Sequence, residues 1–171
     1  MHQLAGERVT GRPEETYKNG AMLRGTEMEA EARAFYEITS KCTIKQVGFC
    51  LAAGYGASPD GLIEEDGTLE IKCPMLATHV SYLIDGRMPT EYFQQVQGGL
   101  LVTGRKWCDF ISYYPGMRPL VVRVLPDMAF LKALKIELGL FCDQLDDMVK
   151  QIRVESSLFC DEPKELVAQI K

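Results

Sequence analysis

The chain has 171 residues, of which 46% are hydrophobic and 25% are charged, and its formal net charge is −5. This length is in the usual range of a single domain with a buried core, and the composition argues against a disordered chain. No apolar run approaches the ~20 residues that a transmembrane helix needs, and the net negative charge argues against a protein that coats DNA regardless of sequence.

Six cysteines are present without a C-x-x-C pair and without a signal peptide before them. Disulfide frameworks occur in oxidising compartments, and zinc sites usually contain closely spaced pairs of cysteines. We therefore expect reduced thiols in a cytosolic protein.

The N-terminal part of the chain divides into a polar segment and a helix. Residues 1–20 are rich in polar residues, glycine and proline, so we expect them to be irregular. Met28, Ala32 and Phe35 then recur at i, i+4 and i+7, which predicts an amphipathic helix. Glu29 lies at the edge of its apolar stripe. It could turn toward a site, or it could form an exposed i,i+4 ion pair with Arg33.

Strand-like segments follow near 43–51 and 56–73. Within the second one, Leu62-Ile63 and Leu69–Lys72 are typical of short strands, and Glu65-Asp66-Gly67 between them has the chemistry of a hairpin turn, with Gly67 free to take positive φ. The two strands should fold back on each other.

The register of this hairpin decides which side chains share a face. A loop over 65–67 puts Asp60 opposite Lys72 and Leu62 opposite Glu70, which gathers Asp60, Glu70 and Lys72 on one face. A two-residue loop would shift the register by one residue and break this cluster.

The chemistry of that cluster suits a divalent cation. Two carboxylates held together repel each other unless a proton or a cation joins them, and hard oxygen ligands favour Mg²⁺, with Mn²⁺ as the alternative. The ammonium of Lys72 beside them could orient a water for attack on a phosphate.

Two helices are predicted next, near 78–85 and 90–103. In the second, Thr90 is a candidate cap, Val96 and Leu100 continue an apolar stripe, and Gly104 is a plausible stop. Gln95 and Gln97 could be ordinary surface glutamines of this helix.

The glycine pair in this helix also needs a reason. Each of Gly98 and Gly99 costs a helix about 1 kcal/mol relative to alanine. We therefore infer close packing of the helix at this point, either against another element of the chain or against DNA.

The C-terminal part contains two strands and a long helix. Alternating runs at 107–114 and 120–125 are joined by the turn residues Pro115-Gly116, and Asp127 is a good cap for an amphipathic helix that reaches Ile152. The tail after Arg153 could form a short helix or stay mobile. This order of elements is compatible with an α/β core, a mixed sheet flanked by helices.

The spacing of Asp60 and Glu70-Ile71-Lys72 resembles the Asp…Glu-x-Lys core of the PD-(D/E)XK nuclease superfamily. The longer string Ser-Pro-Asp-Gly-Leu…Leu-Glu-Ile-Lys-Cys-Pro, with the flanking segments 24–37 and 89–104, resembles the lambda exonuclease or YqaJ-type viral recombinase branch. The resemblance runs from about Arg24 to about Ile152, and it implies a restriction-endonuclease-like core with a central mixed sheet flanked by helices.

The resemblance also implies an activity. Family members are exonucleases of phage or prophage recombination that use Mg²⁺ to degrade the 5′ strand of linear duplex DNA, leaving a 3′ tail for a single-strand annealing protein. Several form a homotrimer. The expected location is the cytoplasm of a bacterial host. Two other functions stay open: an endonuclease or resolvase of the same superfamily, and a non-catalytic DNA-binding module.

One departure from the family pattern affects the expected polarity. Family enzymes carry roughly fifty further residues before the Glu29-type helix, including an Arg and Ser/Thr-rich segment for the terminal 5′ phosphate. Either this chain is a fragment or it is a naturally short version.

The resemblance assigns roles to individual residues. Asp60, Glu70 and the carbonyl of Ile71 would hold the metal with help from Glu29, while Lys72 and Gln95 would position the attacking water. His79 follows a likely helix start and could either touch DNA or pack inside the protein. The candidates for DNA contact are Arg24, Arg33, His79, Tyr92 and Arg105.

Overall fold

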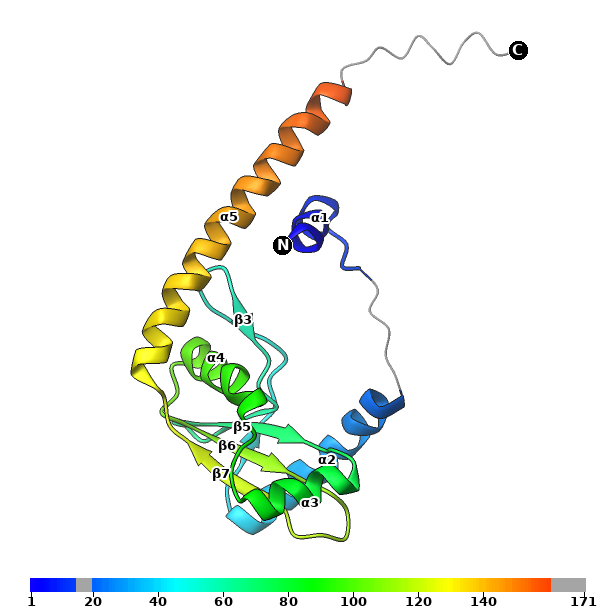
Figure 1. Ribbon diagram of the computed structural model, residues 1–171, viewed down its shortest axis with the longest axis vertical. Coiled ribbons are helices and arrows are strands. Elements are labelled where there is room, and N and C mark those ends of the chain that lie inside the picture. Colours follow the sequence, from blue (N-terminus) through cyan, green and yellow to red (C-terminus); the bar gives the residue numbers. More distant parts are fainter. Residues whose placement is uncertain (15–19, 161–171) are drawn as a thin grey trace, which may run out of the picture. The chain divides into compact units, whose positions relative to one another are not determined.

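Figure 1 shows the computed structural model, in which the structure describes residues 1–14 and 20–160. The chain divides into two compact units, one formed by Tyr17–Ile136 and the other by Met1–Thr16 together with Glu137–Lys171. No helix in the described part of the chain is both long enough and apolar enough to cross a membrane.

The larger unit is built on a five-stranded mixed sheet with the strand order β1-β4-β5-β6-β7. Only the β5–β6 pair is parallel, and the short strands β2 and β3 form a separate two-stranded sheet. The elements of this unit are α2 (Gly20–Ser40), β1 (Ile44–Lys45), β2 (Cys50–Leu51), β3 (Gly56–Ala57), β4 (Gly61–Ile63), β5 (Gly67–Lys72), α3 (Leu76–Asp85), η1 (Thr90–Tyr92), α4 (Phe93–Thr103), β6 (Trp107–Ser112), β7 (Leu120–Val124) and the start of α5 (Met128–Cys160). The expected α/β core with a mixed sheet flanked by helices is confirmed.

The parallel pair requires a crossover, because parallel strands cannot be joined by a tight turn. The crossover contains α3, η1 and α4. It covers one face of the sheet, where Val96 and Leu100 of α4 pack against Cys108 of β6.

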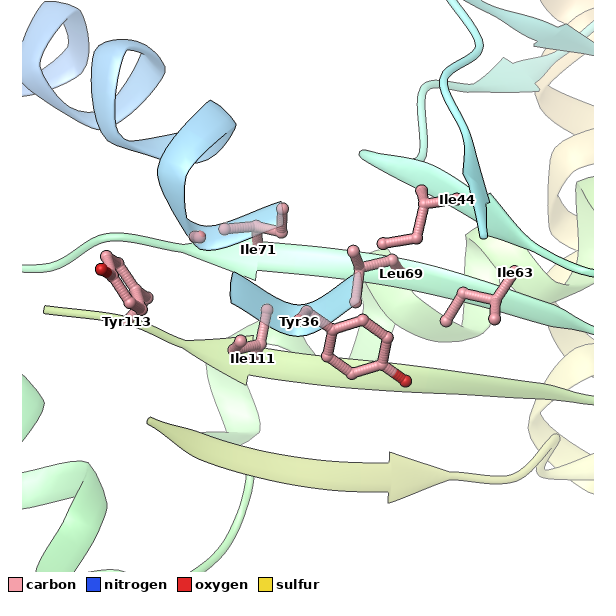
Figure 2. Close-up of a cluster of buried hydrophobic side chains, with 8 residues drawn as sticks. Tyr36, Ile44, Ile63, Leu69, Ile71, Ile111 and Tyr113 are labelled. Atoms are coloured by element: carbon pink, nitrogen blue, oxygen red, sulfur yellow. The ribbon is translucent and has the colours of Figure 1, made fainter. Parts of the chain in front are cut away.

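The opposite face packs against α2. Figure 2 shows this core, in which Tyr36 of α2 lies against sheet residues that include Leu69, Ile71 and Ile111. Because side chains alternate along a strand, the residues of β5 between these positions, Glu70 among them, point to the face that α4 covers. The hydrophobic cluster therefore lies under α2, while Glu70 and Lys72 lie on the face that α4 covers.

The β4–β5 hairpin has a three-residue loop, but the loop lies one residue earlier than expected. Ile63 pairs with Gly67 and Gly61 with Leu69, so the loop is 64–66 and the predicted pairs at 60 with 72 and 62 with 70 are wrong. The two registers differ by two residues, an even number, so no side chain changes face. The shared face of the acidic residues and the lysine therefore survives the correction.

The glycine of this hairpin serves a purpose other than the expected one. The residue with positive φ is Glu64, at 46°, and Gly67 is the first residue of β5. A Cβ on Gly67 would lie 2.3 Å from Cη2 of Trp107. Glycine is needed there because the indole of the neighbouring strand passes directly over the backbone.

Most of the other boundaries agree with the sequence. Gly104 ends α4 in the left-handed conformation, and the Oδ1 of Asp127 accepts hydrogen bonds from the N–H groups of Ala129 and Phe130, as an N-cap does. Thr90 was wrongly predicted as a side-chain cap, since it is the first residue of η1 and caps nothing there. The residues near 56 pair with β2 instead of extending the hairpin.

The smaller unit pairs two helices. The N-terminus was expected to be irregular, but His2–Thr10 form the helix α1, whose Ala5 packs against Leu145 and Val149 of α5. Arg8 also forms an ion pair with Asp146. Helix α5 continues through Arg153 to Cys160, and residues 161–171 lie outside the described part of the chain.

Candidate functional site

The centre of the site is the carboxylate of Glu70, which β5 presents toward α4. Its Oε1 lies 2.6 Å from Nζ of Lys72 and accepts a 2.6 Å hydrogen bond from Nε2 of Gln95. The Lys72 contact follows from the strand, because residues two apart share a face, and the Gln95 contact follows from the crossover that places α4 over β5. Three of the residues predicted for catalysis are therefore in direct contact.

Asp60 lies beside this group, at the position where the chain enters β4. Its Oδ2 accepts a 2.6 Å hydrogen bond from the N–H of Ile71, and its backbone N–H donates to the carbonyl of Leu69 at 3.1 Å. Both bonds tie the residue to β5. The carboxyl group is thus fixed on the same strand that carries Glu70.

Glu29 lies on α2, and within the described residues no hydrogen bond or ion pair joins its carboxyl group to the other site residues. Burial and the negative charge of Asp60 raise the pKa of Glu29, while Arg33 and Lys72 oppose the shift. Its carboxyl group is therefore close enough to the site for electrostatic coupling. Within the described residues no ion pair joins Glu29 to Arg33, whose charge acts on Glu29 from a distance, and Nε of Arg33 donates to the backbone carbonyl of Asp60 at 3.2 Å.

Burial sets the protonation behaviour of both central carboxyl groups. It raises the pKa of Glu70 to about 7 even though the charge of Lys72 acts in the opposite direction, and it raises the pKa of Asp60 against the bond from Ile71. Burial also works against the charged form of Lys72, but the attraction of Glu70 outweighs it and the pKa of Lys72 is raised. The two carboxyl groups therefore carry their negative charge at a cost, which a bound cation would remove.

The donor set fits a hard divalent cation. Within the described residues, no protein hydrogen bond reaches Oδ1 of Asp60 or Oε2 of Glu70, so each carboxylate has one oxygen held by the protein and one oxygen for another ligand. No three His, Cys, Asp or Glu side chains of that part converge into a complete metal site. Two carboxylates nevertheless match Mg²⁺, which is commonly bound by one or two carboxylates together with water and substrate phosphate oxygens.

Tyr92, predicted as a DNA contact, lies next to the ammonium of Lys72. Nζ of Lys72 is 5.0 Å from the centroid of the tyrosine ring, and the ring also stacks on Phe110 of β6 at 5.3 Å. The ring of Tyr82 of α3 lies 6.5 Å from this ring, nearly perpendicular to it, and its hydroxyl donates to Glu91. Sequence patterns gave no reason to single out Tyr82 or Glu91, because their pairing depends on how α3 and η1 pack together.

Three of the remaining DNA candidates have contacts within the protein. Arg24 donates to the carbonyl of Pro74 at 2.8 Å. Arg105 donates to the carbonyls of Ile63, Glu64 and Gly67, and so braces the hairpin turn. His79 is completely buried, with its two ring nitrogens bonded to Oγ of Ser112 and to the carbonyl of Arg118. Of the two roles expected for His79, DNA contact or packing, these contacts favour packing inside the protein.

Helix α4 corrects two further expectations. Gln97 is not a surface residue, since it is 1% exposed, donates to the carbonyl of Leu125 and accepts from the N–H of Asp127. The packing inferred for Gly98 and Gly99 is absent within the described residues, because a Cβ at either position would meet no atom within 4 Å. The alternative of close approach by DNA is left untouched by this result.

Comparison with known proteins identifies solved structures with the same fold. The chain is 34% identical to an alkaline exonuclease (LHK-Exo) from Laribacter hongkongensis, with a TM-score of 0.84 over 92% of this chain and 84% of that one. A structure of LHK-Exo in complex with dAMP matches equally well. A phage-related exonuclease from Haemophilus somnus 129PT has the same fold, with a TM-score of 0.67 at 14% identity over 91% of this chain and 81% of that one.

The family comparison covers the N-terminal and central parts of the chain. A search of curated proteins gives no significant match. The model of the YqaJ-like viral recombinase domain matches residues 2–106, which extends further toward the N-terminus than the expected start near Arg24 and includes Asp60, Glu70, Lys72 and Gln95. More than half of the chain is matched, and the chain belongs to the YqaJ-like viral recombinase family.

Proposed function

We propose that this protein is a Mg²⁺-dependent DNA exonuclease that hydrolyses the 5′ strand of linear duplex DNA and leaves a 3′ single-stranded tail. The observation that carries the proposal is the contact of Lys72 and Gln95 with Glu70, beside Asp60, in a chain of this family. The names of the related alkaline exonuclease and of its complex with dAMP support a nuclease that acts on DNA.

The acidic residues would hold the cation. Asp60 and Glu70 each offer one carboxylate oxygen, with the carbonyl of Ile71 and the carboxylate of Glu29 as the further predicted ligands. Bound there, Mg²⁺ would supply positive charge to the phosphate oxygens of the scissile bond, with Mn²⁺ as the alternative ion. The carboxyl group of Glu70 must be deprotonated for this purpose, so a proton and the cation compete for this residue, whose pKa burial raises to about 7 when no cation is bound.

Lys72 and Gln95 would arrange the attack. The ammonium of Lys72 is held on the same face as the two carboxylates, where it can orient a water and stabilise its developing negative charge. Gln95 donates to Glu70 and so fixes the rotamer of that carboxylate. Hydrolysis then proceeds by in-line attack of the water on the phosphate, with departure of the 3′ oxygen.

The resemblance to the family supports four further properties of the proposed enzyme. They are the 5′ to 3′ polarity, a homotrimer, a single-strand annealing protein as the partner, and the bacterial cytoplasm as the site of action. Arg24, Arg33 and Tyr92 are the candidates for DNA contact that border the catalytic residues. Arg105 and His79 are the two remaining predicted candidates, and the contacts of Arg105 and the burial of His79 support structural roles for them.

The test is digestion of linear 5′-phosphorylated duplex and of covalently closed circular DNA by the parent chain and by Lys72→Ala, with Mg²⁺ or with EDTA. Labels on the two ends of the linear strand report polarity. Lys106→Ala is the matched control, because Lys106 pairs with Asp66 on the exposed hairpin turn, outside the catalytic group.

Each outcome separates the candidate functions. Loss of the linear DNA alone, dependent on Mg²⁺ and on Lys72, supports the exonuclease, and release of nucleotides from the 5′ label supports the polarity. Nicking of the circle would instead support an endonuclease or resolvase. Absence of cleavage in both substrates, with DNA binding retained, would leave a non-catalytic binding module.

A further inference from the structure

Lys72 has two neighbours that fix the position of its ammonium group. One is Oε1 of Glu70 at 2.6 Å, and the other is the ring of Tyr92, whose centroid lies 5.0 Å from Nζ. The first contact is shared, because Gln95 donates to the same oxygen. The face of an aromatic ring attracts a cation without needing a free lone pair, so the second contact is independent of what else Glu70 binds.

The ring of Tyr92 is itself held by two other aromatic residues. It stacks on Phe110 at 5.3 Å with an interplanar angle of 28°, and Tyr82 meets it nearly edge-on at 6.5 Å and 87°. Such stacked and edge-to-face pairs are the arrangements that aromatic quadrupoles favour. Phe110 belongs to the sheet and Tyr82 belongs to α3, so the ring is fixed from two separate elements.

The hydroxyl groups add directionality to this arrangement. The hydroxyl of Tyr82 donates to Oε1 of Glu91 at 2.8 Å, and it lies 3.5 Å from the hydroxyl of Tyr92. A tyrosine has a single proton to donate. Since Tyr82 gives its proton to Glu91, the hydroxyl of Tyr92 is the donor in the second contact. The chain Tyr92 to Tyr82 to Glu91 therefore has one defined sense.

We propose that Tyr82 and Glu91 are positioning residues that hold the ring of Tyr92 in place, and through that ring hold the ammonium of Lys72 in the catalytic group. The proposal deepens the proposed nuclease function and rests on it for the role of Lys72. It assigns a purpose to α3 and η1, the parts of the crossover that precede Gln95 in the chain. It also explains why a polar network lies beside the site although none of its outer members reaches Glu70.

The need for this support follows from the double use of Glu70. A cation bound at Oε2 of Glu70 would draw negative charge away from Oε1 and so weaken the ion pair with Lys72, the closest partner of Nζ. A long lysine side chain then regains rotamer freedom unless another contact holds it. The ring of Tyr92 remains at the same place, because Phe110 and Tyr82 hold it. These two ring contacts do not involve the carboxyl group of Glu70.

The first readout needs no catalysis. In protein labelled with ¹³C at the lysine ε position, the Lys72 ε-CH₂ protons should be shifted upfield by the ring current of Tyr92, and the signal is assigned by its loss in Lys72→Arg. We expect this upfield shift to shrink in Glu91→Ala and Tyr82→Phe and to disappear in Tyr92→Leu. Glu91 is exposed and Tyr82→Phe keeps the ring, so both variants are expected to fold.

The second readout is kinetic. A contact of this kind contributes a factor of roughly 2 to 10 in rate when it is made at a charged catalytic group. We expect kcat on linear duplex to fall about 3-fold in Glu91→Ala and Tyr82→Phe, with KM unchanged within about 2-fold, and about 10-fold in Tyr92→Leu. Tyr92→Phe keeps the face of the ring and should recover most of the rate that Tyr92→Leu loses.

Tyr113→Phe is the matched control. It also removes a tyrosine hydroxyl that donates to a glutamate, Glu31, at 2.6 Å, but Tyr113 belongs to the core under α2 on the other face of the sheet. Neither the Lys72 signal nor kcat should change in this variant. A general loss of stability would affect the control and the test variants alike.

Two results would overturn the proposal. One is a Lys72 signal that stays in place in Glu91→Ala and Tyr82→Phe, whatever happens to kcat. The other is a displaced signal with kcat unchanged. If the parent protein does not degrade DNA at all, the proposed function fails instead, and the NMR shift still reports whether the three residues hold Lys72.

Discussion

Two buried carboxylates lie on the two parallel strands of the sheet and face opposite sides. Asp109 of β6 points to α2, where Tyr36 donates to its Oδ2 at 2.5 Å and Arg123 donates to both oxygens at 2.8 Å. Glu70 of β5 points to α4, where Lys72 and Gln95 share one of its oxygens. Donors of the protein bond both oxygens of the first carboxylate, whereas within the described residues they bond only one oxygen of the second.

The difference separates a structural charge from a functional one. A buried carboxylate with donors on both oxygens is stable by itself and links elements, in this case α2, β6 and β7. A buried carboxylate with one oxygen unused by the protein, as in Glu70, pays for its burial with a raised pKa and has room for an external ligand. Comparing the two residues by the same substitutions should therefore give opposite results.

The largest expected effect is on activity. Glu70→Gln should lower the nuclease rate about 100- to 1,000-fold, because the amide cannot hold a cation or keep the charge balance of the site. Asp109→Asn, measured per folded molecule, should stay within about 3-fold of the parent. Initial rates on linear duplex with Mg²⁺ check both values, and a large rate loss in Asp109→Asn would contradict the comparison.

The second effect is on stability, where the substitution of Asp109 should matter more than that of Glu70. Asp109→Ala should lower the free energy of unfolding by about 2–4 kcal/mol, because it leaves the hydroxyl of Tyr36 and part of Arg123 without their acceptor. The value lies below that of a fully buried pair, since the side chain of Arg123 is 55% exposed. Urea unfolding monitored by circular dichroism measures it. Equal stability of parent and variant would remove the structural role of Asp109.

The third effect concerns a divalent cation. Mg²⁺ at about 100 times its dissociation constant should stabilise the parent protein by about 2.7 kcal/mol, because it binds the folded state alone. Asp109→Asn should respond in the same way, while Asp60→Asn should not respond. Thermal unfolding with and without Mg²⁺ tests this, with titration calorimetry as a second measure. A normal response in Asp60→Asn would place the cation elsewhere.

The smallest effect is on the pH dependence of stability without metal. The pKa of Glu70 is about 7 in the folded protein against 4.5 in the unfolded chain, so the folded state binds more protons between these values. Stability in EDTA should therefore fall as pH rises from 5 to 8, and Glu70→Gln should remove about 1–2 kcal/mol of that fall. Denaturation at several pH values measures the slope. An unchanged slope in the variant would show that Glu70 does not titrate in this window.

Local patterns in the sequence were sufficient for the parts of the site that a single strand or helix determines. The two-residue period placed Glu70 and Lys72 on one face, and Gly104 and Asp127 marked helix ends that the structure confirms. The hairpin loop lies one residue earlier than the sequence predicts, because Gly67 belongs to the strand and not to the turn. Glycine is required at position 67 because the ring of Trp107 lies against the backbone there. Trp107 is 40 positions away in the chain, so a local sequence pattern cannot predict this contact.

Long-range pairings account for the rest. Tyr36 and Asp109 are 73 residues apart, and nothing in the sequence around either residue predicts that they meet. Gln97 was interpreted as helix surface because glutamine is usually exposed, and only the return of the chain toward α5 encloses it. The contacts of Arg105 with three carbonyls likewise appear only once the hairpin and β6 are adjacent.

The glycine pair of α4 has a consequence for engineering. Gly98 and Gly99 weaken the helix by roughly 1 kcal/mol each relative to alanine, and within the described residues no atom of the chain occupies the space beside them. Alanine at both positions would thus make the isolated protein more heat-resistant without any repacking. The double alanine variant should therefore be more stable, with the substitutions on the helix that carries Gln95. A loss of turnover in this variant would show that activity requires glycine at these positions.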